Sequence, residues 1–246
     1  MQQIAVQTFN PLPYIERYYA AVEVDEDNNP FPRLKAWEFL YEYIWGQSRS
    51  WSSLTDAANL DTTALHVGFY LANWGMFRGR SELLRNSNLD LMKELVLRLF
   101  QGKGPDLFDL SGEDFLPGAS NLARNQALFD EVVQIFHNMP GKVSWTDTLI
   151  SKILLGVWGE YPALDRYYKL GVRSLYPYRG LVEVSGRSLT SLMELVETEG
   201  FELPAIKTEC LRLAYPKGRL LDMAFFQVGL EQDNSLGGYS IVRMDR

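Results

Sequence analysis

The chain has 246 residues, of which 46% are hydrophobic and 22% are charged. This balance is typical of a folded protein and excludes an intrinsically disordered chain. The net charge of −7 means that the surface as a whole does not attract polyanions, so nucleic-acid binding would require a local basic patch.

The first strong pattern in chain order follows Pro32, a residue that suits the entrance of a helix. Its apolar face consists of residues at helical spacing, namely Leu34, Trp37, Leu40, Tyr41 and Ile44. A second helix is expected over 61–76, with Leu65, Phe69 and Ala72 on its apolar face.

The middle of the chain continues in the same way. Asn88 is expected to cap a helix that ends at the glycines of 102–104, and 122–136 has the pattern of a long amphipathic helix. The capping-box pattern at 144–147 opens a further apolar helix that runs to Val157. We predict that this helix is the buried centre of the fold.

Three later helices are expected, over 187–198, 204–214 and 218–229. Only 181–184 and 239–244 alternate as strands do, and both segments are short. The fold class that follows is mainly α, a single helical domain over 1–246 with at most one or two short strands. The alternative is a division into two lobes near 102–118.

Common catalytic signatures are missing from the sequence. It holds no phosphate-binding loop, no dinucleotide fingerprint, no metalloprotease motif and no nucleophile elbow. His66 and His137 are the only histidines and Cys210 is the only cysteine, so we expect no metal site, no disulfide and no cofactor. We interpret Cys210 as a small core residue.

The same composition bears on the compartment. A single cysteine fits a reducing, cytoplasmic setting. The first thirteen residues contain no basic side chain and no long apolar run, so we expect no signal peptide. No apolar stretch approaches the roughly 20 residues that span a bilayer, so we expect no membrane partner.

Residues 139–168 read MPGKVSWTDTLISKILLGVWGEYPALDRYY. This segment resembles the core of helix-hairpin-helix DNA glycosylases, in which an apolar-Pro-Gly hairpin leads into an apolar helix, a turn and an essential aspartate. Here 139–141 would be the hairpin, 149–158 the helix, 159–162 the turn and Asp165 the aspartate. The resemblance implies a glycosylase-like helical fold.

The resemblance also implies roles for individual residues. Gly141 and Lys142 would hold a phosphate at the hairpin, and Asp165 would stabilise positive charge on the sugar as the glycosidic bond breaks. The second hairpin glycine is missing, and Lys152 precedes Asp165 by only thirteen positions, fewer than the lysine of the bifunctional members. The match therefore implies a monofunctional enzyme, or the same fold without the chemistry.

Each of these residues has an alternative interpretation. Asp165 follows Pro162 closely and is also an excellent candidate for a helix N-cap. Lys152 lies in an apolar helical run, where its side chain would extend to solvent, or would contact a phosphate instead. Asp222 also lies in an apolar helix, so we expect it to pair with an arginine if it is buried.

A local basic segment runs from 166 to 179, and no acid interrupts it. Its cations are Arg166, Lys169, Arg173 and Arg179, with tyrosines interleaved at 167, 168, 176 and 178. This composition suits phosphate contacts and base stacking, so DNA or RNA is a candidate partner. A smaller cluster holds Arg78, Arg80 and Arg85. The alternative for 166–179 is a solvated loop above packed tyrosines.

A broader resemblance covers the blocks 66–84, 151–171 and 215–229, which look like uncharacterised bacterial proteins. It implies no activity. Three hypotheses remain open. They are a nucleic-acid-processing protein with Asp165 as its carboxylate, a non-catalytic helical protein that binds a protein or a nucleic acid, and an enzyme whose small anionic substrate is held by Arg78, Arg80 and Arg166.

Overall fold

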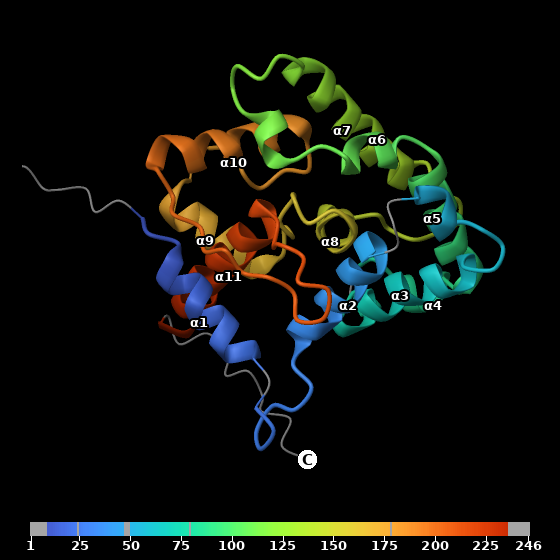
Figure 1. Ribbon diagram of the computed structural model, residues 1–246, viewed down its shortest axis with the longest axis horizontal. Helices are drawn as coiled ribbons and strands as arrows, with labels where there is room; N and C mark the ends of the chain where they lie inside the picture. Colours follow the sequence, from blue (N-terminus) through green and yellow to red (C-terminus); the bar gives the residue numbers. More distant parts are fainter. Residues whose placement is uncertain (1–8, 24, 47–49, 79, 178, 236–246) are drawn as a thin grey trace, which may run out of the picture.

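A computed structural model describes residues 9–23, 25–46, 50–78, 80–177 and 179–235 (Figure 1). These residues form a mainly helical domain, as the sequence predicts. Its elements are α1 (Leu12–Val22), α2 (Arg33–Gly46), η1 (Trp51–Leu54), α3 (Leu60–Asn73), α4 (Leu83–Asn86), α5 (Leu89–Gln101), α6 (Gly104–Phe108), η2 (Gly112–Phe115), α7 (Leu122–His137), α8 (Asp147–Val157), α9 (Arg166–Leu175), α10 (Gly186–Glu199) and α11 (Lys217–Ser235).

Helix α8 is the centre of this domain. In Figure 1 it is seen almost end-on in the middle of the view, with the other helices around it. Every residue from Leu149 to Val157 is buried, which confirms the predicted central helix. Its cap is Thr146, whose hydroxyl accepts the N–H of Leu149, so the helix begins later than the expected start at 144.

The buried C-terminal end of α8 needs partners for its free carbonyl groups. Two tryptophans of α2 supply them. The indole N–H of Trp37 donates to the carbonyl of Leu155, and that of Trp45 donates to Val157, both at 2.9 Å. The predicted face of α2 thus packs on α8, because all five of its expected core residues are buried.

Helix α3 buries a different face from the one expected. Leu65 and Phe69 are 58% and 62% exposed, whereas Ala64, Val67 and Tyr70 are buried. Both faces of this helix are apolar, so periodicity alone favours neither. The hydroxyl of Tyr70 donates to the carbonyl of Lys152 in α8, and this polar contact helps to fix the face that turns inward.

The helix expected over 204–214 is absent. Carboxylates of α2 accept the backbone N–H groups of this segment instead: Glu38 accepts from Glu209, and Glu42 accepts from Cys210 and Leu211. These bonds replace the intrahelical bonds that a helix would make, so the segment folds as a loop along α2.

Within the described ranges, the only β pairing consists of two isolated bridges, Asp25 with Asn29 and Lys207 with Ala214. The strand expected over 181–184 is therefore not formed, and 239–244 lies outside the described residues. The expected helices over 187–198 and 218–229 are present as α10 and α11.

Two glycines allow α9 and α11 to pack with their backbones in contact. A Cβ atom at Gly171 would lie 2.0 Å from the carbonyl oxygen of Phe225, and one at Gly229 would lie 1.9 Å from that of Tyr167. No side chain larger than hydrogen fits at either position without separating the helices. This contact fixes the first residues of α9 relative to α11.

The buried side chains form one hydrophobic core. Residues of the stretch 102–118 contribute to it, since Leu107, Phe108 and Phe115 are almost completely buried. Among the described residues, no helix has both the length and the apolar character needed to cross a membrane.

Candidate functional site

The nine residues 138–146 connect α7 to α8 and contain the turn that the glycosylase resemblance treats as a hairpin. Gly141 has a φ of +96°, a left-handed conformation that favours glycine, and nothing lies close to its α-carbon on the side-chain side. Gly141 and Lys142 are both exposed. The residues that the glycosylase resemblance assigns to phosphate binding therefore lie on the surface.

This turn is bonded to the segment that carries the smaller arginine cluster. The N–H of Ser144 donates to the carbonyl of Ser81 at 3.0 Å, and the amide of Asn86 donates to the carbonyl of Lys142 at 3.4 Å. Arg78, Arg80 and Arg85 are exposed, like Lys142. We call these four cations the hairpin surface, because the two hydrogen bonds join the segments that carry them: Arg78, Arg80, Arg85 and Lys142.

None of these four cations has an ion-pair partner among the described residues. Glu82 is the one acid within the segment, and it lines a cavity of about 300 Å³ together with Arg78 and Arg85. The local charge is therefore positive in a chain whose net charge is −7.

Asp165 caps α9 and at the same time holds a buried lysine. One carboxylate oxygen accepts the N–H of Tyr168 at 3.0 Å, and the other accepts the amino group of Lys152 at 3.0 Å. The side chain of Asp165 is 18% exposed and that of Lys152 only 2%. The expectation that Lys152 extends to solvent is wrong, because Asp165 and the ring of Trp74, 4.2 Å from its nitrogen, hold it inside.

A second buried ion pair lies next to this one. A guanidinium nitrogen of Arg219 is 2.7 Å from a carboxylate oxygen of Asp222, and both side chains are almost fully buried. The other oxygen of Asp222 accepts the N–H of Ala163 at 2.9 Å. Burial raises the pKa of Asp222, and the charges of Lys152 and Arg219 oppose this rise. The expected arginine partner of Asp222 is thus confirmed.

The basic segment that begins at 166 forms α9 rather than a loop over its first ten residues. Arg166 is paired with Asp233 of α11 at 2.7 Å, so its charge is partly neutralised. Arg173 and Arg179 are exposed and Lys169 is partly exposed. Tyr168 is buried, as the alternative interpretation expects of the tyrosines, whereas Tyr178 lies outside the described residues.

No hydrogen bond or ion pair among the described residues joins the two basic clusters. Arg166 follows Asp165 directly, and its side chain is paired with Asp233 of α11. Arg173 is seven residues further, or roughly 10 Å along the helix axis. In Figure 1, α9 and α4 lie on opposite sides of α8. The cations that follow Arg166 in α9 are therefore not part of the hairpin surface.

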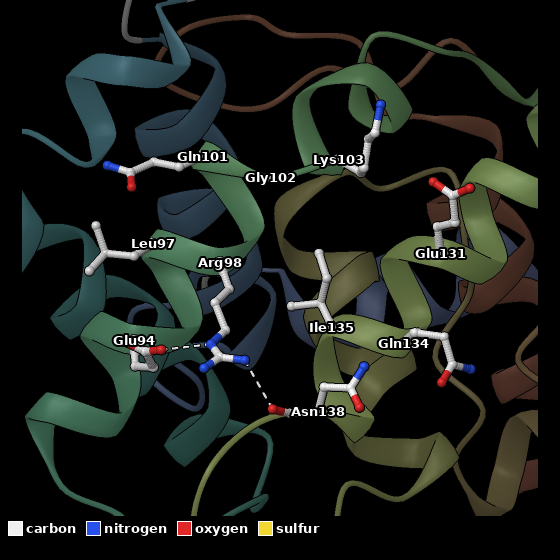
Figure 2. Close-up of a pocket in the computed structure, with 10 residues that line it drawn as sticks. All are labelled: Glu94, Leu97, Arg98, Gln101, Gly102, Lys103, Glu131, Gln134, Ile135 and Asn138. Carbon is white, nitrogen blue, oxygen red and sulfur yellow. Dashed lines mark hydrogen bonds and ion pairs between the residues drawn. The ribbon is translucent and has the colours of Figure 1, made fainter.

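A groove of about 640 Å³ lies between α5 and α7 (Figure 2). Arg98 lies inside it and is already bonded, to Glu94 at 2.6 Å and to the carbonyl of Asn138 at 2.9 Å. The rest of the lining mixes acids, amides and Lys103. Nothing in this lining indicates a role beyond contact with solvent. Nor does any group of three or more potential metal ligands occur in the described chain.

An apolar surface lies along α2 and α3. Phe31 is 92% exposed and Phe39 is 50% exposed, and with Phe69 they line a cavity of about 600 Å³. Cys210 lies at its edge and is exposed, so its interpretation as a core residue is wrong. Exposed apolar patches of this kind occur at protein-binding surfaces.

The sequence analysis missed Glu160, which it treated only as part of a turn. Burial raises the pKa of this carboxyl to about 7, although the N–H groups of Gly112 and Gly218 and the charge of Lys217 act in the opposite direction. An acid directly after an apolar helix and between Trp158 and Tyr161 was the available signal.

Comparison with known proteins finds no family model, no curated protein and no solved structure that matches the chain.

Proposed function

We propose that the chain binds DNA or RNA at the hairpin surface and acts on DNA as a monofunctional N-glycosylase-like hydrolase, with Asp165 as its carboxylate. The observation that carries this proposal is the pair of hydrogen bonds that join the turn at 142–144 to the segment at 81–86. They gather four exposed cations at the hairpin, where a phosphate backbone would approach. A cytoplasmic location is compatible with this role.

The position of Asp165 supports its part in the proposal. It lies on the chain that follows α8, and Lys152 of that helix holds its carboxylate. Each carboxylate oxygen has a lone pair beyond the one already used, so the group can still face a substrate. A carboxylate there would stabilise the positive charge that develops on the sugar, once the base has been turned out of the duplex.

Binding is tested by fluorescence anisotropy with labelled single-stranded and duplex oligonucleotides. Affinity should fall steeply between about 50 mM and about 200 mM salt, because each contacted phosphate releases counterions. Arg80→Glu with Arg85→Glu should weaken binding of all sequences by roughly tenfold or more. Absence of binding at low salt to any of these oligonucleotides would contradict the proposal.

Arg124→Glu is the matched control. Arg124 is an exposed arginine on the first turn of α7, and the hairpin begins after the last turn of that helix. The separation along the helix is roughly 20 Å. Arg124→Glu changes the net charge of the protein by the same amount as Arg85→Glu alone, so an equal loss of affinity in these two single variants would indicate a non-specific effect of charge.

Catalysis is tested by base release from duplexes that carry a panel of damaged bases. Asp165→Asn keeps a helix cap but removes the charge. If Asp165 is catalytic, release should slow by about a hundredfold or more while oligonucleotide affinity changes little. Equal release by both proteins would leave Asp165 with its structural roles only.

The apolar surface at Phe31, Phe39 and Phe69 favours a second candidate function, that of a non-catalytic protein that binds a protein partner. An enzyme that holds a small anion with Arg78, Arg80 and Arg166 is less favoured, because Arg166 is paired with Asp233.

A further inference from the structure

A cavity of about 400 Å³ opens where α2 and the loop after α6 meet the C-terminal end of α8. Four aromatic side chains line it: Tyr41, Trp45, Phe108 and Trp158. The tryptophan rings are fixed in place, since the indole N–H of Trp45 donates to Val157 and that of Trp158 donates to Leu110, each at 2.9 Å. Both indole donors are therefore used, and the rings can offer a ligand only their carbon edges and π faces.

One carboxyl group faces this aromatic lining. Glu160 lines the cavity, and its Oε2 atom is buried without a hydrogen-bond partner among the described residues. A buried acceptor without a donor destabilises a fold, so such atoms are uncommon and call for an explanation. Asp109 also lines the cavity, but it is exposed.

The charges around Glu160 leave it without a close counter-ion in the described chain. Lys217 at the start of α11 is the nearest cation to act on it, and the amino group of Lys217 is paired with Glu113 of η2 at 2.8 Å. Tyr41 of α2 faces it from the other side, and the charge of Glu160 contributes to the raised pKa of that tyrosine. The cavity is thus aromatic and, when Glu160 ionises, negative.

We propose that this cavity binds a small organic ammonium ion that carries at least one N–H group, with the aromatic rings around the cation and Glu160 as its counter-charge. Aromatic faces attract ammonium groups, and the attraction is larger where water is excluded. An N–H donor would also bond to the carboxylate. An anion would be repelled by Glu160 and Asp109, and a neutral apolar ligand would leave the carboxyl without a partner.

The site is separate from the proposed nucleic-acid function. Glu160 follows the C-terminal end of α8, whereas the hairpin surface lies at its N-terminal end. Loss of one function therefore does not require loss of the other.

The test uses benzylammonium chloride as the probe, added to the whole chain and followed by the indole N–H resonances in a ¹H–¹⁵N NMR spectrum. Benzyl alcohol is the neutral comparison, and tetramethylammonium is the cation without an N–H. We expect benzylammonium to bind more tightly than either and to shift the resonances of Trp45 and Trp158. Equal affinity for benzylammonium and benzyl alcohol, or shifts only at other tryptophans, would overturn the proposal, as would no binding.

Three variants sharpen the result. Glu160→Gln should weaken benzylammonium binding by about tenfold or more and leave the binding of benzyl alcohol unaffected. A tenfold change in affinity has the same free energy as a pKa shift of about one unit, which is a usual size for the interaction between two charges. Glu194→Gln makes the same change at an exposed carboxylate of α10 and should bind as the unmodified protein does. Trp45→Leu removes a ring that is only partly buried and should also weaken binding, which keeps the test valid if Glu160→Gln does not fold.

Binding should also depend on pH. In the unmodified protein the affinity for benzylammonium should rise between about pH 6 and about pH 8, as Glu160 loses its proton, and then level off. In Glu160→Gln the affinity should be flat over that range. A rise that persists in Glu160→Gln would assign the effect to another group and overturn the role of this carboxyl.

Discussion

Helix α8 lies between two buried acidic environments that differ in how their charges are balanced. Beside the middle of the helix, Asp165 and Asp222 each contact a buried cation, Lys152 at 3.0 Å and Arg219 at 2.7 Å. Beyond its C-terminal end, Glu160 is partly exposed and lies beside aromatic rings, its Oε2 atom is buried, and it has no ion pair among the described residues. The carboxylates of the first environment are paired with cations, although Arg219 Nε has no hydrogen-bond partner among the described residues, whereas the carboxyl of the second environment has no cation beside it.

This difference separates structure from recognition. A buried carboxylate with a cation and a backbone donor, such as Asp222, joins α11 to the segment before α9 and gains nothing from a ligand. Burial destabilises a carboxylate without a counter-ion even where backbone N–H groups act on it, as they do on Glu160, and a cationic ligand can reduce that cost. We therefore expect substitutions in the first environment to lower stability and substitution of Glu160 to raise it.

The largest effect should come from Asp222→Ala. It would leave the guanidinium of Arg219 buried without its carboxylate and should lower the free energy of unfolding by about 3–5 kcal/mol, measured by urea denaturation. Asp233→Ala is the control, because its partner Arg166 is 66% exposed and the loss there should stay below about 1 kcal/mol. Equal losses in the two variants would remove the distinction between a buried pair and a surface pair.

The next effect concerns Lys152 and Asp165. Asp165→Asn keeps the cap of α9 but leaves the buried amino group of Lys152 without its anion, so we expect a loss of about 1–3 kcal/mol at neutral pH. Lys152→Met removes the stranded charge, so the double variant should recover part of the loss. A double-mutant cycle by urea denaturation measures this coupling, and additive effects would indicate that the pair contributes nothing.

Part of this architecture could be predicted from the sequence. Helices α2, α5 and α8 each have a single dominant apolar face, or are apolar throughout. The spacing of their apolar residues was therefore enough to predict both the helix and its buried face. Helix α3 has apolar residues on both faces, and the choice between them depends on the bond from Tyr70 to α8. The segment 204–214 fails as a helix because its N–H groups bond to carboxylates some 170 positions away, which no local pattern contains.

The same reasoning applies to the site. The helix-capping role of Asp165 could be predicted, since it depends on the residues next to it. The burial of Lys152 could not, because Trp74 and Asp165 come from other segments and enclose it only in the folded chain. Nor could the environment of Glu160, whose neighbours come from α2, η2 and α11.

The smallest effect, and the one opposite in sign, should come from Glu160→Gln. Burial raises the pKa of Glu160 from 4.5 in the unfolded chain to about 7, so the folded protein binds this proton more tightly than the unfolded chain does. The stability that this contributes is fully present below the lower value and is lost as the pH rises through about 7. Glutamine has no proton to lose, so the variant should not show this decline.

The gain of Glu160→Gln over the unmodified protein should therefore grow with pH. It should increase by about 1–3 kcal/mol between about pH 4 and about pH 8, measured by urea denaturation across that range. Glu194→Gln, at an exposed carboxylate of α10, should follow the profile of the unmodified protein much more closely. If Glu160→Gln instead lost stability at the higher pH, the ionised carboxylate would have a partner, and the contrast with Asp165 and Asp222 would not hold.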